Sequence, residues 1–418
     1  MSVIPMHADP AAAMRKKKKF LYAAGGFDIP FLIILLSILV IGLVCLYSAS
    51  YVYAFYNNDG DSFFYIKKQL IFAALGIVAM FALSFVDYHR WHRFAWILWV
   101  FSILLLGAVL LMPARSGIHR WIRIPGIGQF QPSEVAKFSL ILLFSHLISL
   151  NYKRISTFTG GFLPLLGILM VTCGLVFLEP HLSGTILICM LGLVLMFVGG
   201  CRLRYLMLIV LLGASAVFFA VFVLHYEQER IDVWLHPMEV YARDVAGRNE
   251  AWQTVQSLFT IGSGGLLGQG LGNSRQKHLF LPEPQNDFIF AVVCEELGFI
   301  GAALILLLFA LLIWRGFVIA MNAPDKFGSV LAIGLTAQIG IQVILNIAVV
   351  TNSMPNTGIS LPFFSSGGTS LLLLLSEMGV LLSISRAGNA REQRLAEQHR
   401  AETERMLQRT RYRSRAAR

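Results

Sequence analysis

The chain has 418 residues, of which 56% are hydrophobic and only 14% are charged. Soluble domains carry about 25% charged residues, so a soluble chain of this composition would lack the polar surface needed to cover its core. We expect an integral membrane protein, in which the net charge of +11 reflects membrane topology and attraction to anionic lipid rather than binding of nucleic acid.

Apolar runs long enough to cross a bilayer define the predicted elements. In chain order they lie at 30–50, 69–86, 95–112, 134–150, 162–178, 184–200, 205–224, 288–313, 328–350 and 364–385. Each is expected to be a helix, because lipid offers the backbone no other hydrogen-bond partner. The sequence therefore predicts an all-α, polytopic membrane fold with about ten transmembrane helices.

Lys and Arg residues predict the orientation, since cytoplasmic loops carry an excess of both. The basic cluster at 15–19 precedes the first run and is placed in the cytoplasm. Counting turns then brings the following basic positions to the same side: His89, Arg90, Arg93, Lys153, Arg154, Arg202, Arg204, Arg315, Lys326 and the tail from Arg386. Both termini are expected to be cytoplasmic.

Three parts follow from this topology: a basic segment at 1–29, a membrane domain at 30–385 and a basic cytoplasmic tail at 386–418. Residues 225–287 are expected to form one large loop on the outer face. Connections of this length are uncommon and are usually functional. The stretch AWQTVQSLFTI at 251–261 has the pattern of an amphipathic helix that lies on the membrane surface.

Several cations fall on the outer face, against the expected bias. They are Arg115, His119, Arg120 and Arg123 in the loop at 113–134, with Arg275 and Lys277 in the large loop. An anionic ligand would explain them, and the two parallel donors of Arg suit phosphate. Contact with lipid headgroups, or pairing with acids of the same loops, explains them equally well.

Charged and polar residues also fall inside the apolar runs. Glu134 and Lys137 are spaced i, i+3 and can face each other on one helix, either as a structural ion pair or as part of a site. The other members of this set are Glu295, Glu296, Gln338, Gln342, Asn346 and Glu377. Since polar residues within membranes face a bundle interior or a water-filled cavity, we expect an internal polar cavity that opens outward.

Three segments resemble one family. RWIRIPGIGQFQPSEVAK at 120–137, GLGNSRQKHLFLPEPQNDFIFAVVCEELGFIGA at 270–302 and PNTGISLPFFSSGGTSLL at 355–372 are similar to motifs of the SEDS family (shape, elongation, division and sporulation). The resemblance covers nearly all of the membrane domain. The combination of GLGNS with LPEPQNDFIF looks more like the division and sporulation branch (FtsW, SpoVE) than the elongation branch (RodA).

The resemblance implies a peptidoglycan glycosyltransferase. Such enzymes polymerise lipid II, a disaccharide-pentapeptide on undecaprenyl diphosphate, into β-1,4 glycan at the outer face of the bacterial cytoplasmic membrane. It further implies a class B penicillin-binding protein as partner, together with division or sporulation proteins, and a divalent cation, Mg²⁺ or Mn²⁺. The alternatives are a lipid II flippase and a structural anchor for the transpeptidase.

The family's functional aspartate corresponds to Asp287. Attack of a sugar hydroxyl on an α-linked donor gives a β bond by one inversion, so the reaction needs a general base on the acceptor and charge stabilisation on the departing diphosphate. Asp287 is the candidate base. The alternative is a helix N-cap, because Asp before an apolar helix commonly accepts hydrogen bonds from the first amides.

The remaining site residues are also implied by the resemblance. Substrate contacts are expected from Arg115, Arg120, Trp121, Gln131, Glu134, Lys137, Arg275, Lys277, Pro355, Thr357 and Ser366, and Asp287 and Glu283 are the candidate metal ligands. The sequence departs from the family pattern at 179–185, EPHLSGT, where relatives carry a Gln-Pro-Asp type motif. Glu179 either takes the place of that aspartate or is structural.

Overall fold

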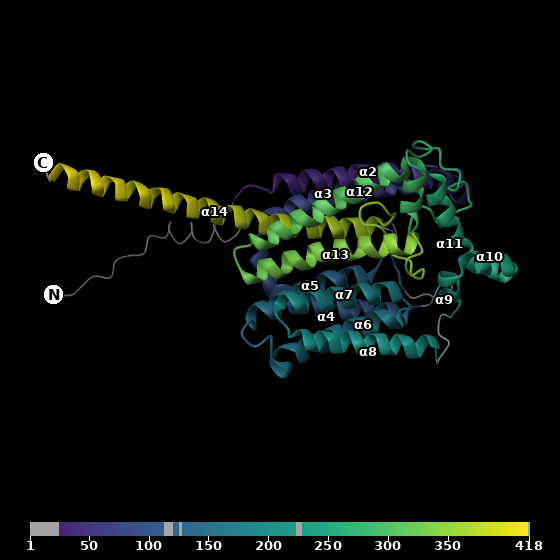
Figure 1. The fold of residues 1–418 in the computed structure, drawn as a ribbon, viewed down its shortest axis with the longest axis horizontal. Coiled ribbons are helices and arrows are strands. Elements are labelled where there is room, and N and C mark those ends of the chain that lie inside the picture. Colours follow the sequence, from purple (N-terminus) through teal and green to yellow (C-terminus); the bar gives the residue numbers. More distant parts are fainter. Residues whose placement is uncertain (1–24, 113–119, 125–127, 223–227, 417–418) are drawn as a thin grey trace.

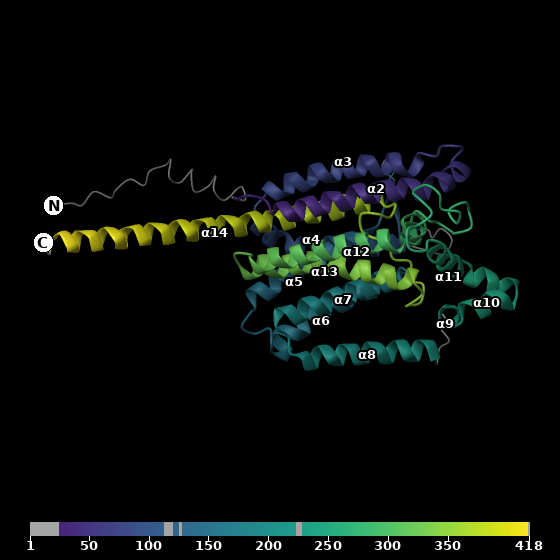
Figure 2. The same cartoon turned by 45° about the horizontal axis from the view of Figure 1, so that its top comes forward.

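The structure is a computed structural model that describes residues 25–112, 120–124, 128–222 and 228–416. Long helices run side by side as a bundle, and short helices and irregular segments gather at one end, here called the loop-bearing end (Figures 1 and 2). The basic cluster at 15–19 lies outside the described residues.

The long helices correspond to the predicted runs. They are α2 (Ile29–Asn57), α3 (Phe64–Phe85), α4 (Trp91–Leu111), α5 (Pro132–Leu150), α6 (Leu163–Leu178), α7 (Leu182–Gly199), α8 (Leu203–Phe222), α12 (Ile289–Met321), α13 (Lys326–Val350) and α14 (Gly368–Ala416). Within the described residues, nine helices are long and apolar enough to cross a membrane. The tenth predicted run is α8, which has 20 residues and lies at the edge of the bundle (Figures 1 and 2).

Short elements complete the chain. They are the 3₁₀ helix η1 (Tyr88–Arg90), the π-helical turn η2 (Phe158–Phe162), the helices α9 (Gln228–Leu235), α10 (Pro237–Arg243) and α11 (Val245–Ser263), and the strands β1 (Ile122–Ile124) and β2 (Gly128–Phe130). The two strands pair antiparallel, with Arg123 opposite Gln129. The predicted all-α fold is confirmed except for this hairpin, and the predicted surface helix at 251–261 lies within α11.

Local chemistry sets the helix starts. Asp28 accepts a hydrogen bond of 3.0 Å from the Phe31 amide at the start of α2, and Asp325 accepts one of 2.7 Å from the Gly328 amide at the start of α13. Such caps satisfy amides that have no partner within the helix. Asp28 also binds Arg315 of α12 at 2.6 Å, which ties the first helix of the bundle to a helix distant in sequence.

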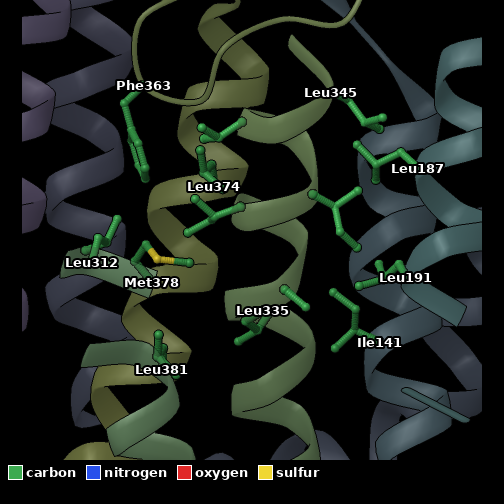
Figure 3. Packing of buried hydrophobic residues seen from close by; sticks show 14 of the residues in the cluster. Ile141, Leu187, Leu191, Leu312, Leu335, Leu345, Phe363, Leu374, Met378 and Leu381 are labelled. Atoms are coloured by element: carbon green, nitrogen blue, oxygen red, sulfur yellow. The ribbon is translucent and has the colours of Figure 1, made fainter. Parts of the chain in front are cut away.

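The core centres on α13. Its side chains pack against α5, α7, α12 and α14, and Figure 3 shows Leu335 of α13 between Met378 of α14 and Ile141 of α5. Because helices pack side chains at close to crystalline density, this core fixes the ends of the surrounding helices relative to one another. The last helix, α14, continues beyond the bundle as a long arm at the end opposite the loops (Figure 1).

Helix α12 is broken near its start. Gly298 has a φ of +67°, a left-handed conformation that favours glycine. The backbone groups freed by this break bond to the segment at 265–270, including Gln269 N–H to the Glu295 carbonyl at 2.9 Å and Phe299 N–H to the Gly265 carbonyl at 2.9 Å. The irregular half of the large loop is thereby fixed to the helix that follows Asp287.

Candidate active site

A cavity of about 1120 Å³ lies at the loop-bearing end of the bundle. All three motif segments contribute to its wall, together with α3 and the start of α7. The predicted residues that line it are Arg120, Trp121, Gln131, Glu134, Lys137, Glu283, Asp287 and Ser366. Residues separated by some 250 positions in the chain therefore meet in one polar space, as the prediction of an internal polar cavity requires.

Asp287 belongs to the turn that leads into α12. Its backbone carbonyl accepts a hydrogen bond of 2.8 Å from Asn346 of α13, whose amide also binds the Ile359 carbonyl at 2.6 Å. The helix itself begins after Phe288 without a side-chain cap, so the alternative interpretation of Asp287 as an N-cap is wrong. No described residue donates a hydrogen bond to its carboxylate, which faces the cavity.

Burial raises the pKa of Asp287 to about 6; the Glu283 carboxylate also raises it, and the Arg120 guanidinium opposes both. A carboxylate with a pKa near 6 is mostly ionised at neutral pH, yet holds a proton more readily than an ordinary Asp. Since a general base works best when its pKa lies near the operating pH, this environment suits proton abstraction.

Arg120 lines the same cavity as Asp287, and the charge of each residue acts on the pKa of the other. One of the terminal nitrogens of Arg120 donates a hydrogen bond to the Pro180 carbonyl. This bond connects the divergent segment at 179–185 to the cavity. Burial lowers the pKa of Arg120, as does the charge of Arg230, while Asp287 and Glu179 act in the opposite direction. The guanidinium still carries its charge at neutral pH, because an ordinary Arg pKa lies far above 7.

His181 and Gln131 form a neutral polar wall. Gln131 Nε2 lies 3.4 Å from His181 Nδ1, and both residues line the cavity. Burial lowers the pKa of His181 to about 3, with further contributions from the charges of Arg120 and Lys137. His181 is therefore neutral at physiological pH and can donate or accept a hydrogen bond without adding charge.

Glu134 and Lys137 form the predicted ion pair on α5. The Lys137 ammonium lies 2.8 Å from Glu134, and the two side chains are 6% and 15% exposed. Both line the cavity rather than face lipid. Deeper in the bundle, Glu377 of α14 accepts a hydrogen bond of 2.9 Å from Gln338 of α13.

The segment at 358–369 closes the remaining wall and holds the turn that carries Asp287. Ser365 Oγ donates to the Asn286 carbonyl at 2.7 Å, and the Ser366 amide donates to the Gln285 carbonyl at 2.8 Å. Gly358, with a φ of +68°, lies so near the site that an added Cβ would be 3.0 Å from Asp287 Oδ2. Glycine is favoured there by backbone conformation and by space.

These segments are the ones by which the chain compares with known proteins. A model of the FtsW, RodA and SpoVE family, described as cell cycle protein, matches residues 29–390. The chain belongs to this family. The predicted SEDS membership is thereby confirmed, and the match spans the whole helix bundle that holds the cavity.

Individual relatives agree with this assignment. Stage V sporulation protein E of Bacillus subtilis (strain 168) is 45% identical over 367 residues, covering 86% of this chain and 97% of the relative. A probable peptidoglycan glycosyltransferase FtsW of Trichlorobacter lovleyi is 38% identical, covering 86% and 93%. These similarities support the predicted FtsW and SpoVE branch.

Solved structures of the family share the fold. One chain in a structure described as "Structural coordination of polymerization and crosslinking by a peptidoglycan synthase complex" superposes with a TM-score of 0.72 at 29% identity, covering 87% of this chain and 98% of that chain. Rod shape determining protein RodA of Thermus thermophilus superposes with a TM-score of 0.63 at 27% identity, covering 86% and 97%.

Two predicted cations lie elsewhere in this family member. Lys277 is fully buried, 2.7 Å from Glu296 of α12 and 3.2 Å from the Ser48 hydroxyl of α2. Arg275 is exposed, and its backbone amide donates to Glu295 at 3.1 Å. Neither lines the cavity, so the prediction that they contact the diphosphate there is corrected. Their segment instead fixes the loop to α12 and α2.

Three further predictions have different outcomes. Pro355 and Thr357 precede Gly358, but neither is part of the cavity lining, so the geometry does not support the expectation that they contact the substrate there. Arg115 lies outside the described residues. Ser366 lines the cavity as expected, with its backbone amide engaged by Gln285.

Sequence reasoning missed three contributors. His181 and Gly358 line the cavity, and so does Gln69 of α3, which donates to the Ser365 carbonyl at 3.2 Å and accepts from the Gly367 amide at 3.2 Å. The available signal for Gln69 was a polar residue at the start of an apolar run. For His181 it was the divergence from the family motif.

The donor set for a metal ion is small. Among the described residues, no group of three or more His, Cys, Asp or Glu side chains is placed to hold a metal ion. Glu283 and Asp287 both line the cavity. One or two carboxylates suffice for Mg²⁺ when substrate phosphates and water complete its coordination, so these residues fit a cation that arrives with a diphosphate.

Proposed function

We propose that this chain is a peptidoglycan glycosyltransferase that polymerises lipid II into β-1,4 glycan strands during division or sporulation. The observation that carries the proposal is a cavity lined by Arg120 and by the Asp287 carboxylate, which accepts no hydrogen bond from the part of the chain that the structure describes. Membership of the family, and similarity to proteins named as peptidoglycan glycosyltransferases, support the same activity.

The proposed orientation places the loop-bearing end at the outer face of the bacterial cytoplasmic membrane. The basic loops and the tail from Arg386 then lie in the cytoplasm, as the positive-inside rule requires. The cavity opens where a lipid-linked sugar in the outer leaflet can reach it. The undecaprenyl chain stays among the apolar helix surfaces while the diphosphate and sugars enter the polar space.

Asp287 acts as general base. Its carboxylate removes the proton from the 4-hydroxyl of the acceptor sugar as the oxygen attacks the anomeric carbon of the donor. The α-linked diphosphate leaves from the opposite face, so a β bond forms with one inversion. Asp287 is suited to this role because its carboxylate is half-buried, accepts no hydrogen bond from the described residues and has a pKa raised to about 6.

Arg120 and Lys137 stabilise the leaving diphosphate. Arg120 presents a charged, planar donor group to phosphate oxygens, and Lys137 exchanges part of its interaction with Glu134 for the substrate. Both charges are held in a partly buried space, where electrostatic stabilisation is stronger than in water. Gln131 and His181 supply neutral hydrogen bonds to the sugars, and Trp121, which is 44% exposed, covers the rim.

A divalent cation, Mg²⁺ or Mn²⁺, supplies additional neutralisation of the diphosphate when bound. Glu283 is the protein residue best placed to contact it, because it lines the cavity and is exposed. Asp287 remains available as the base in this arrangement. The ion would be bound mainly through the substrate.

The proposed partner is a class B penicillin-binding protein, which crosslinks the new strand. A structural relative of this chain is part of a complex that coordinates polymerization and crosslinking. Helices α9 to α11 project from the loop-bearing end and expose Leu235, Met238 and Val245. Such apolar residues on a projecting surface suit a protein contact. Division or sporulation proteins complete the assembly.

The experiment that tests the activity is polymerisation of purified lipid II by the protein with its transpeptidase, comparing wild type with Asp287→Asn. The amide keeps the shape of the side chain but accepts no proton, so glycan synthesis should fall by at least about 100-fold. Folding of the variant is checked by its thermal unfolding in detergent. Equal synthesis by both proteins would remove Asp287 from the mechanism.

The same purified proteins distinguish the proposed enzyme from a lipid II flippase. A transporter moves lipid II between leaflets of a vesicle without making glycan, whereas the proposed enzyme makes glycan in detergent, where no leaflets exist. The carboxylate and guanidinium held together at the loop-bearing end favour the enzyme. Movement of lipid II by a wild-type protein that makes no glycan would support the flippase.

A further inference from the structure

Glu179 is a buried carboxyl group whose role the mechanism leaves open. It is fully buried, and neither side-chain oxygen has a hydrogen-bond partner among the described residues. It also stands directly after α6, at the C-terminal end of that helix. The partial negative charge of a helix C-terminus disfavours an anion, so this location favours a neutral carboxylic acid.

Arg120 has an unpaired donor in the same place. Its terminal nitrogen bonds to the carbonyl of Pro180, the residue that follows Glu179, while its Nε is buried and has no partner among the described residues. Buried polar groups are nearly always paired. Among the described residues, a donor on Arg120 and an acceptor on Glu179 that suit each other are therefore both unpaired, and the two groups act on each other's pKa.

We propose that Glu179 is a positioning residue for Arg120: in its neutral form it leaves the guanidinium available to the donor diphosphate, and in its ionised form it withdraws Arg120 into an ion pair. This inference rests on the proposed function, because it assigns the diphosphate to Arg120. Glu179 does not touch the substrate in this scheme and acts through the charge it offers to the guanidinium.

The two states of Glu179 differ by the one negative charge that its carboxyl group carries when it is ionised. A neutral carboxyl leaves Arg120 with its full positive charge, facing Asp287 and the cavity. An ionised Glu179 accepts from Arg120 Nε and competes with phosphate for the same fork of donors. The buried location strengthens the competition, because interactions between charges are stronger away from water.

The surroundings agree with a neutral Glu179 at physiological pH. Burial raises the pKa of Glu179 to about 8, and Arg120 only partly opposes this. Burial raises the pKa of Asp287 to about 6, so near pH 7 the base is ionised while Glu179 is protonated. Besides Glu179, the charges of Asp287 and of Arg230 on α9 act on the pKa of Arg120. Arg120 and Lys137 of α5 both act on His181, and Glu283 acts on Asp287. His181 stays neutral above pH 4 because its pKa is lowered to about 3.

The test measures binding of lipid II in detergent between pH 6.5 and about 9.5, for wild type and Glu179→Gln. The wild-type Kd should be constant below pH 8 and then rise by up to about tenfold per pH unit, as expected for one ionising group. The Gln variant, which cannot ionise, should bind like wild type at pH 7 and lose this alkaline rise. Glu397→Gln, an exposed change on α14, serves as control and should keep the wild-type profile.

A second variant covers the case in which Glu179→Gln does not fold. Glu179→Asp keeps an ionisable group at a different distance from Arg120, so its alkaline rise should move by at least about half a pH unit. An alkaline rise that is unchanged in the Gln variant, or in the Asp variant, overturns the inference. Binding is measured without turnover, so this result is independent of whether Asp287 is the catalytic base.

Discussion

The buried pair between Lys277 and Glu296 allows the anchoring role of the large loop to be measured. The two side chains are 0% and 2% exposed, and their charged atoms lie 2.7 Å apart. Lys277 also donates to Ser48 Oγ at 3.2 Å and lies 4.8 Å from the centre of the Tyr51 ring. Replacing Lys277 with Met removes all three interactions and leaves the Glu296 charge buried.

The expected cost follows from that uncompensated charge. Removal of one partner of a buried ion pair typically destabilises a protein by about 3–5 kcal/mol, which is roughly a 10²- to 10⁴-fold change in an unfolding equilibrium. Replacement of both partners by apolar residues is often neutral. We therefore expect Lys277→Met to be strongly destabilised, and Lys277→Met with Glu296→Leu to recover most of the loss.

The assay is reversible unfolding in mixed detergent micelles, run as a double-mutant cycle with both single variants and the pair. Activity per folded molecule is measured alongside, with lipid II as substrate. If Lys277 anchors the loop, the pair couples by several kcal/mol and KM for lipid II changes little in the double variant. Unchanged stability of Lys277→Met with a raised KM would refute this reasoning and restore Lys277 as a substrate contact.

The remaining predictions concern the cavity. Gly358→Ala should lower kcat by at least about 10-fold, because its φ of +68° disfavours alanine and the new Cβ would lie 3.0 Å from Asp287 Oδ2; wild-type turnover with correct folding would contradict this. Glycan synthesis should fall as the pH drops through about 6, because Asp287, whose pKa is raised to about 6, must be ionised to accept a proton. A pH–rate profile from 4.5 to 7.5 measures this fall, and a flat profile would exclude Asp287 as the base. Chelation of divalent cations should abolish synthesis, and Glu283→Gln should raise the Mg²⁺ concentration needed for half-maximal rate by about 10-fold; an unaltered Mg²⁺ dependence would exclude Glu283.

Long apolar runs were sufficient to predict the helix bundle. A run of about 20 apolar residues has no stable alternative to a helix in lipid, and every predicted run corresponds to a helix of the structure. The Glu134 and Lys137 pair was equally predictable, because i, i+3 spacing brings side chains together within one helix. These features depend on local sequence alone.

The composition of the cavity required the tertiary structure. In the sequence, Lys277 and Arg120 are both cations in loops predicted for the same face. In the fold, the break at Gly298 and the ion pair with Glu296 bury Lys277. Arg120 instead stays at the cavity, where it donates to the Pro180 carbonyl. The same holds for Asp287, which the sequence offers as a helix cap and whose carboxylate accepts no hydrogen bond from the described residues of the fold. Sequence determined which residues are charged and which segments are helical. Packing between segments distant in the chain decided which charges are paired, because the pairing depends on long-range contacts that no local sequence pattern encodes.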